Sequence, residues 1–283
     1  MRARRLSGMS VNRMVPNVLT LLALCAGMTA MRFAMGGNFV AAVFSIIAAG
    51  IFDGLDGRMA RLLKATSSFG AELDSLSDFV SFGVAPAAVL YLWTLSELQG
   101  FGWAIALLFA VCCALRLARF NTETPDEMPS YAAPFFTGAP APAGAGLVMV
   151  PMFLSFEWGD WLFRSPYLNA VTVTGIALLM ISKVPTVSLK RIRIPHDMVV
   201  PTLLGFGVAT AFLTTEPWLT LTVVGIVYTS SIPFTVRSYY RLKRAAEARK
   251  AEMAEQPDTV VPLPAASPFQ RGEASAPPTE WRH

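Results

Sequence analysis

The chain has 283 residues, of which 54% are hydrophobic and only 15% are charged. Soluble domains carry fewer apolar and more charged residues, so this composition argues against a soluble enzyme and is that of a membrane protein. The net charge of +4 is modest, and membrane topology and anionic headgroups explain it, so no nucleic-acid partner is expected.

Apolar runs follow one another along most of the chain, each about as long as a bilayer-spanning helix, roughly 17–25 residues with its flanks. The first run continues past Met31 without a small-residue cleavage site, so we expect a retained span and not a signal peptide. The expected fold class is therefore an all-α, polytopic bundle of about eight transmembrane helices. The predicted spans cover residues 15–34, 37–62, 70–95, 101–118, 141–156, 166–182, 199–214 and 217–236.

Lysine and arginine cluster before the first span and after the second, fourth, sixth and eighth, whereas the other connections carry only Arg164. Since short cytoplasmic loops are enriched in these residues, both termini are predicted to be cytoplasmic. Three regions result: a basic N-terminus at 1–14, a transmembrane domain at 15–244, and a tail at 245–283. The Pro/Ala/Ser-rich tail cannot bury a core, so we expect it to be disordered and cytoplasmic.

Four aspartates lie within FDGLDGRMARLLKATSSFGAELDSLSD, residues 52–78. We expect two helices in this segment. On the second of them, Asp74 and Asp78 are one turn apart on a shared face. Small residues beside acids let a ligand or another backbone approach closely. On the first of the two helices, an arc of about 100° holds two carboxylates and two very small residues, namely Asp53, Asp56, Gly57 and Ala60.

The four carboxylates need a polar cavity, because an aspartate facing lipid costs roughly 2.5–3.5 kcal/mol near mid-membrane. Clustered carboxylates also repel one another, so protons or cations must neutralise them. Oxygen ligands without His or Cys suit hard divalent ions. The pattern predicts two Mg²⁺ or Mn²⁺ ions that would clamp a diphosphate. A cation-coupled transporter also uses intramembrane acids, but near the midplane, and it remains the alternative of another class.

The spacing D-x-x-D-G-x-x-A-R-x8-G-x3-D-x3-D resembles the signature of the CDP-alcohol phosphotransferases. Members of that family move a substituted phosphoryl group from a CDP-linked donor to an alcohol and release CMP, using two metal ions at the cytoplasmic membrane face. The resemblance implies a transmembrane catalytic domain and a direct reaction without a covalent lipid–enzyme intermediate. The matching residues are Asp53, Asp56, Gly57, Ala60, Arg61, Gly70, Asp74 and Asp78.

Further segments are similar to the phosphatidylserine synthase branch of that family. The resemblance implies CDP-diacylglycerol and L-serine as substrates, contact with membrane lipids, a homodimer and a bacterial cytoplasmic membrane. Glycerol 3-phosphate, inositol or choline remain open as alternative acceptors in a sister enzyme. The segments are VPNVLT at 15–20, LDSLSDFVSFGVAPA at 73–87, RLARFN at 116–121 and FTGAPAPAGAG at 136–146, where Ala139 replaces the usual leucine.

The resemblance also implies roles for single residues. All four aspartates would be metal ligands, and Asp78 would in addition take the proton of the attacking hydroxyl. Gly70 is expected to break the turn between the two acidic helices. The positive-inside rule alone would also explain basic residues such as Arg61 and Lys190. The implied nucleotide or diphosphate contacts are Asn17, Thr20, Gly57, Ala60, Arg61 and Gly70, and the implied serine or lipid-phosphate contacts are Arg116, Arg119, Asn121 and Lys190.

Overall fold

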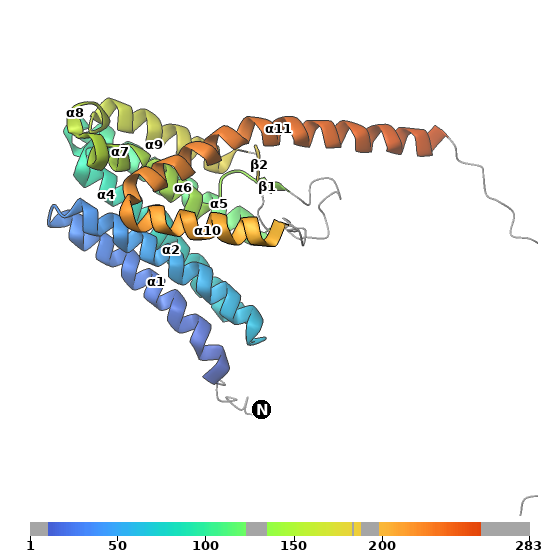
Figure 1. Ribbon diagram of the computed structural model, residues 1–283, viewed down its shortest axis with the longest axis horizontal. Helices are drawn as coiled ribbons and strands as arrows, with labels where there is room; N and C mark the ends of the chain where they lie inside the picture. The colour runs from blue at the N-terminus through green and yellow to red at the C-terminus, as the bar shows by residue number, and fades with distance from the viewer. Residues whose placement is uncertain (1–10, 123–134, 183, 188–197, 256–283) are drawn as a thin grey trace, which may run out of the picture.

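The computed structural model describes residues 11–122, 135–182, 184–187 and 198–255. These ranges form a helical bundle with two short strands (Figure 1). The elements are α1 (Val11–Met35), α2 (Phe39–Leu62), α3 (Ser68–Asp78), the π-helical η1 (Phe79–Val84), α4 (Ala85–Trp93), the 3₁₀ turn η2 (Leu95–Leu98), α5 (Gly100–Thr122), β1 (Phe135–Thr137), α6 (Ala141–Val148), α7 (Val150–Trp158), α8 (Asp160–Phe163), α9 (Pro166–Ile181), β2 (Pro185–Val187), α10 (Val199–Thr215) and α11 (Pro217–Glu255).

Six helical segments of the described chain are long and apolar enough to cross a membrane. They correspond to predicted spans one to five and eight, so the polytopic helical architecture is confirmed. Predicted spans six and seven correspond to the shorter apolar helices α9 and α10, and the total of eight stays a prediction. The six segments are Met14–Met35, Phe39–Leu62, Ser68–Trp93, Gly100–Thr122, Ala141–Trp158 and Pro217–Ala248.

Helices α1 and α2 form a hairpin and pack against each other along their length (Figure 1). The turn contains Gly37 in the left-handed region, with φ of +74°, a conformation that glycine adopts without a Cβ clash. Asn38 caps α2, because its side-chain oxygen accepts a hydrogen bond from the Ala41 backbone N–H at 3.0 Å. The hairpin places the N-terminal half of α1 beside the acidic half of α2.

The second acidic segment begins after a turn that contains Lys64 at φ of +49°. Ser67 caps α3 by accepting a hydrogen bond from the Gly70 N–H at 3.0 Å. Gly70 therefore lies in the first turn of α3, and the expectation that it breaks the turn between the helices is wrong. It packs closely against α1, because a Cβ there would lie 3.1 Å from the Asn17 side-chain oxygen and would make that side chain shift.

The strands β1 and β2 are not expected from the sequence. They pair antiparallel, with Phe135 opposite Val187. Beyond β1, Gly138 has φ of +75° and donates from its N–H to the Val184 carbonyl at 2.8 Å. The Thr186 hydroxyl donates back to the Gly138 carbonyl at 2.8 Å. The strand pair thus ties the connection after α5 to the connection after α9.

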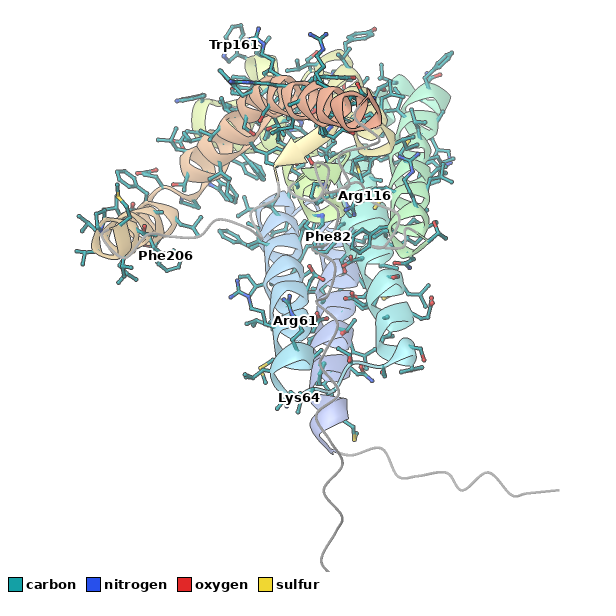
Figure 2. The ribbon with its side chains drawn as sticks, turned by 90° about the vertical axis from the view of Figure 1, so that its right-hand side faces the viewer. Arg61, Lys64, Phe82, Arg116, Trp161 and Phe206 are labelled. Carbon is teal, nitrogen blue, oxygen red and sulfur yellow. The ribbon has the colours of Figure 1, made fainter. Side chains whose placement is uncertain are left out.

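Helix α10 contains no buried residue, and Figure 2 shows its Phe206 set apart from the acidic helices. Helix α11 continues to Glu255, so residues 245–255, which we expected in a disordered tail, are helical in the structure. This stretch is rich in Ala, Glu, Lys and Arg, which are strong helix formers. Lys243 and Glu247 also form an i,i+4 ion pair at 3.9 Å. Residues 256–283 lie outside the described chain.

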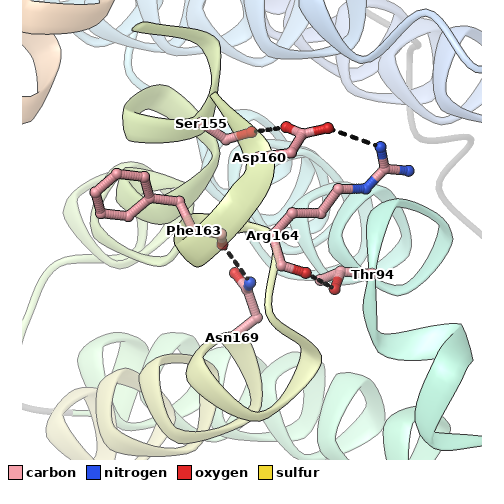
Figure 3. A network of polar contacts seen from close by, with 6 residues as sticks. All are labelled: Thr94, Ser155, Asp160, Phe163, Arg164 and Asn169. Carbon is pink, nitrogen blue, oxygen red and sulfur yellow. Dashed lines mark hydrogen bonds and ion pairs between the residues drawn. The ribbon is translucent and has the colours of Figure 1, made fainter. Parts of the chain in front are cut away.

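A polar network lies at the end of the bundle where α4 ends and α9 begins (Figure 3). The Thr94 hydroxyl donates to the Arg164 carbonyl at 2.8 Å. Asp160 accepts from the Ser155 hydroxyl and from Arg164 Nη1, the latter at 3.1 Å. The Ser155 hydrogen bond is the main cause that lowers the pKa of Asp160. The network joins the α7–α9 connection to the end of α4.

Asn169 lies at the centre of this end, fully buried, and its Nδ2 donates to the Phe163 and Ser165 carbonyls at 2.9 Å each. We expect Asn169→Ala to lower the free energy of unfolding by about 1–3 kcal/mol, because it removes the side-chain donor of the Phe163 carbonyl, whereas the Ser165 carbonyl keeps the Asn169 backbone N–H. Thermal unfolding in detergent measures this. The control is Thr172→Val on the same helix, whose hydroxyl bonds only to the Leu168 carbonyl at an exposed site. Equal stability of the two variants would contradict the assignment.

Candidate active site

Three aspartates from two helices converge at the end of the α1–α2–α3 cluster. One carboxylate oxygen from each of Asp53, Asp56 and Asp74 lies within 4.8 Å of the other two. Asp56 is 5% exposed, while Asp53 and Asp74 are half-buried. The predicted acidic cluster is therefore present, although its residues come from segments about twenty positions apart in the sequence.

Asp78 completes the acidic set. Its carboxyl group lies in hydrogen-bond contact with that of Asp53, and it also interacts electrostatically with Asp74. Two carboxyl groups in such contact need a shared proton or a bridging cation, because two bare carboxylates repel each other strongly at that distance. Asp78 ends α3, and the π-helical stretch Phe79–Val84 follows directly. Such π-helical turns occur frequently at functional sites.

Helix α1 fixes both acidic helices through hydroxyl groups. The Thr20 hydroxyl donates to the Asp56 carboxylate at 2.6 Å, which orients that side chain. The Ser77 hydroxyl donates to the Thr20 carbonyl at 3.0 Å, and the Ser81 hydroxyl donates to the Ala23 carbonyl at 3.1 Å. A Cβ on Gly27 would lie 2.8 Å from the Ser81 Cα, so glycine is required there for α1 and η1 to approach.

A small cavity of about 190 Å³ opens beside these acids, between α1, α2 and α3. Its walls include five of the six residues for which a nucleotide contact was expected, namely Asn17, Thr20, Gly57, Ala60 and Gly70. Asp56 and Asp74 line it as well. Arg61 does not line the cavity: its Nε donates to the Gly57 carbonyl at 3.0 Å, and its side chain lies on its own helix.

The residues expected to bind serine or lipid phosphate do not form one group. Arg116 interacts electrostatically with Asp78 and packs over the Phe120 ring, 5.9 Å from its centre. Figure 2 shows Arg116 among the helices near Phe82, whereas Arg61 lies on α2 closer to Lys64. Arg119 instead donates from Nη1 to the Ile181 carbonyl at 2.9 Å, which fastens α5 to the end of α9.

Asn121 also has a structural contact, because its Nδ2 donates to the Ser75 hydroxyl at 2.8 Å and joins the end of α5 to α3. Lys190 lies outside the described residues. Only Arg116, of the group expected to bind serine or lipid phosphate, is thus placed beside an acidic residue. Ser81 lies on the helix face that the sequence assigns to Asp74 and Asp78, whereas Ser77 was not expected at the site, although its position next to Asp78 is a usable signal.

Comparisons with known proteins agree with this geometry. Residues 13–181 match the family described as CDP-alcohol phosphatidyltransferase, and residues 197–233 match CDP-alcohol phosphatidyltransferase 2. A protein of Mycobacterium tuberculosis strain H37Rv is 41% identical over 80% of this chain and 79% of its own length. One of Mycobacterium leprae is 38% identical over 91% and 86%, and one of Helicobacter pylori strain 26695 is 36% identical over 63% and 73%. All three are called "CDP-diacylglycerol--serine O-phosphatidyltransferase".

Proposed function

The chain belongs to the CDP-alcohol phosphatidyltransferase family, and we propose that it transfers the phosphatidyl group of CDP-diacylglycerol to the hydroxyl of L-serine, giving phosphatidylserine and CMP. It is a multi-pass membrane protein. The observation that carries the proposal is the convergence of Asp53, Asp56 and Asp74 within 4.8 Å, beside a cavity between α1, α2 and α3. The names of relatives that cover most of the chain support serine as the acceptor.

Enzymes of this family generally use a divalent metal, and the residues present fit one. The donor set consists of carboxylate oxygens, which suit Mg²⁺ and Mn²⁺ better than softer metals. The contact between Asp53 and Asp78 needs a shared proton or a cation, and a metal ion would be such a cation. We propose that the four aspartates hold two such ions. When bound, they would polarise the diphosphate and offset the charge on departing CMP.

The protein's own residues bind and orient the reactants. Asn17 and Thr20 line the cavity proposed for the nucleotide, where Gly57 and Ala60 leave space and Gly70 allows α3 to start close to α1. Arg61 lies one turn after Gly57, with its Nε bonded to the Gly57 carbonyl, and the family resemblance supports its assignment to the diphosphate. Thr20 holds the Asp56 carboxylate through its hydroxyl.

The proton of the serine hydroxyl passes to Asp78 in this proposal. The serine oxygen forms a bond to the lipid-side phosphorus while the bond from that phosphorus to the CMP oxygen breaks in line. Arg116, beside Asp78, supplies a fixed cation for the serine carboxylate. Asn121 holds α5 against α3 through Ser75 and so keeps this arginine in place.

We also propose that the site lies at the cytoplasmic face of a bacterial membrane. The acids lie near the end of α2 that carries Arg58 and Arg61 and is followed by Lys64, which is the end that the positive-inside rule assigns to the cytoplasm. Lys190 belongs to the next basic connection and would bind lipid phosphate there. The family resemblance further leads us to propose a homodimer, which cross-linking in native membranes would test.

A panel of acceptors tests the function. Purified protein in detergent, given CDP-diacylglycerol and Mn²⁺ or Mg²⁺, is expected to release CMP with L-serine and not with glycerol 3-phosphate, inositol or choline. Each alcohol serves as the control for the others, since the donor and the metal are the same throughout. Release with one of the other alcohols alone would make the chain a sister enzyme of the same family. Absence of release with every alcohol would contradict the proposal.

A further inference from the structure

An apolar cavity of about 260 Å³ lies between α2, α6, α7 and α11. Ile46 and Gly50 of α2, Phe82 of η1 and Leu147 of α6 are among its walls. Tyr228 of α11 is the only described residue of the lining whose side chain ends in a polar group. A single polar group in an otherwise apolar wall is the usual arrangement for orienting a ligand in a pocket.

The Tyr228 hydroxyl is fully shielded from solvent. It lies close to Thr186 of β2 and interacts electrostatically with Arg116 of α5. Among the described residues it completes no hydrogen bond of ordinary geometry. The Thr186 hydroxyl already donates its proton to the Gly138 carbonyl, so it can only accept from Tyr228. A buried hydroxyl is costly unless it has a partner, and the Arg116 guanidinium lies near enough to interact with this one electrostatically.

The surrounding structure fixes the position of this hydroxyl. One turn earlier on α11, Gly225 packs so closely that a Cβ would lie 2.8 Å from a methyl carbon of Val150. Further back, the Trp218 ring packs against Phe156 of α7, with ring centres 4.9 Å apart. The strand pair holds Thr186 from the other side. Tyr228 is therefore a preorganised donor and not a mobile surface residue.

We propose that Tyr228 is a substrate-binding residue whose hydroxyl donates a hydrogen bond to an oxyanion that Arg116 also holds. Arg116 interacts with Asp78, so the chain Tyr228, Arg116, Asp78 leads from the apolar cavity to the acidic cluster. The inference rests on the proposed function. The oxyanion can be the serine carboxylate or a phosphoryl oxygen on the lipid side of the donor, since both present the same acceptor chemistry at the boundary between an apolar and a polar region.

Tyr228→Phe tests the proposal, because it removes the hydroxyl and keeps the ring. We expect the KM of one substrate to rise roughly tenfold, the size of a lost hydrogen bond to a charged group, with thermal unfolding unchanged. A rise for serine identifies the carboxylate, and a rise for CDP-diacylglycerol in mixed micelles identifies the phosphoryl group. Tyr240→Phe, at an exposed position of the same helix, is the matched control.

Unchanged KM values for both substrates, whatever happens to kcat, would overturn the proposal. A second readout separates this failure from failure of the proposed function. CDP-diacylglycerol is expected to raise the thermal midpoint of the parent protein, and serine added with it to raise it further. If the parent shows these shifts without CMP release, the proposed reaction fails, while a smaller shift in Tyr228→Phe still supports the binding role. Equal shifts in parent and variant would overturn that role.

Discussion

Replacing Asp74 by Asn is expected to reduce CMP release by more than about 100-fold, while the protein still inserts and purifies normally. Changing a residue that only orients a metal ligand typically lowers metal affinity or activity 10–100-fold, and changing a direct ligand should lower it further. Asn keeps the shape of the side chain and removes the negative charge that the two proposed ions would need. The same result is expected for Asp53→Asn, because its carboxylate lies within 4.8 Å of the other acids.

The matched control for Asp74 is Glu72→Gln on the same helix. Glu72 is exposed and does not line the cavity beside the acids. This variant loses one acidic charge from α3 and is expected to keep activity within a few-fold of the parent. Near-normal turnover of Asp74→Asn, or an equal loss of turnover in Glu72→Gln, would contradict the metal-site assignment.

Replacing Arg116 by Lys is expected to raise the KM for serine roughly tenfold. Lysine retains the positive charge but loses the planar, two-pronged geometry with which a guanidinium binds a carboxylate. A lost charge-assisted hydrogen bond of about 1.4 kcal/mol corresponds to that factor. Initial rates with varied serine at saturating CDP-diacylglycerol measure the effect. The KM for CDP-diacylglycerol is expected to stay nearly constant.

Arg119→Lys provides the contrast, since the two arginines lie one turn apart on α5. Arg119 binds the Ile181 carbonyl, so this variant is expected to lower thermal stability and to leave the serine KM within about twofold of the parent value. If Arg119→Lys raises the serine KM and Arg116→Lys does not, the two roles are exchanged. If Arg116→Lys weakens CDP-diacylglycerol and spares serine, this guanidinium belongs to the phosphate site.

The sequence predicted those parts of the site that follow from helical periodicity. The helical period puts Asp53 and Asp56 on one face of α2, and in the structure both lie close to Asp74. Apolar run lengths predicted the helices as well, because a bilayer imposes a minimum length. In both cases local spacing determines the outcome, so a single sequence suffices.

Contacts between distant segments could not be predicted in this way. Nothing near Arg119 indicates that it binds the Ile181 carbonyl, and nothing near Tyr228 indicates Thr186 as its neighbour. The strand pair is too short to leave a pattern, since each strand has three residues. Gly70 was expected in the turn because glycine often marks one, whereas it lies in the first turn of α3, close to the Asn17 side chain of α1. In each of these cases tertiary packing decides.

We propose that the acids of α2 and α3 hold the metal ions of the reaction. Crystals of the protein grown with Mn²⁺ and CDP-diacylglycerol, measured at the manganese absorption edge, test it most directly. We predict two anomalous peaks, each next to carboxylate oxygens from the set Asp53, Asp56, Asp74 and Asp78. Manganese bound elsewhere in a protein that shows metal-dependent CMP release, with no peak at these aspartates, would contradict the claim.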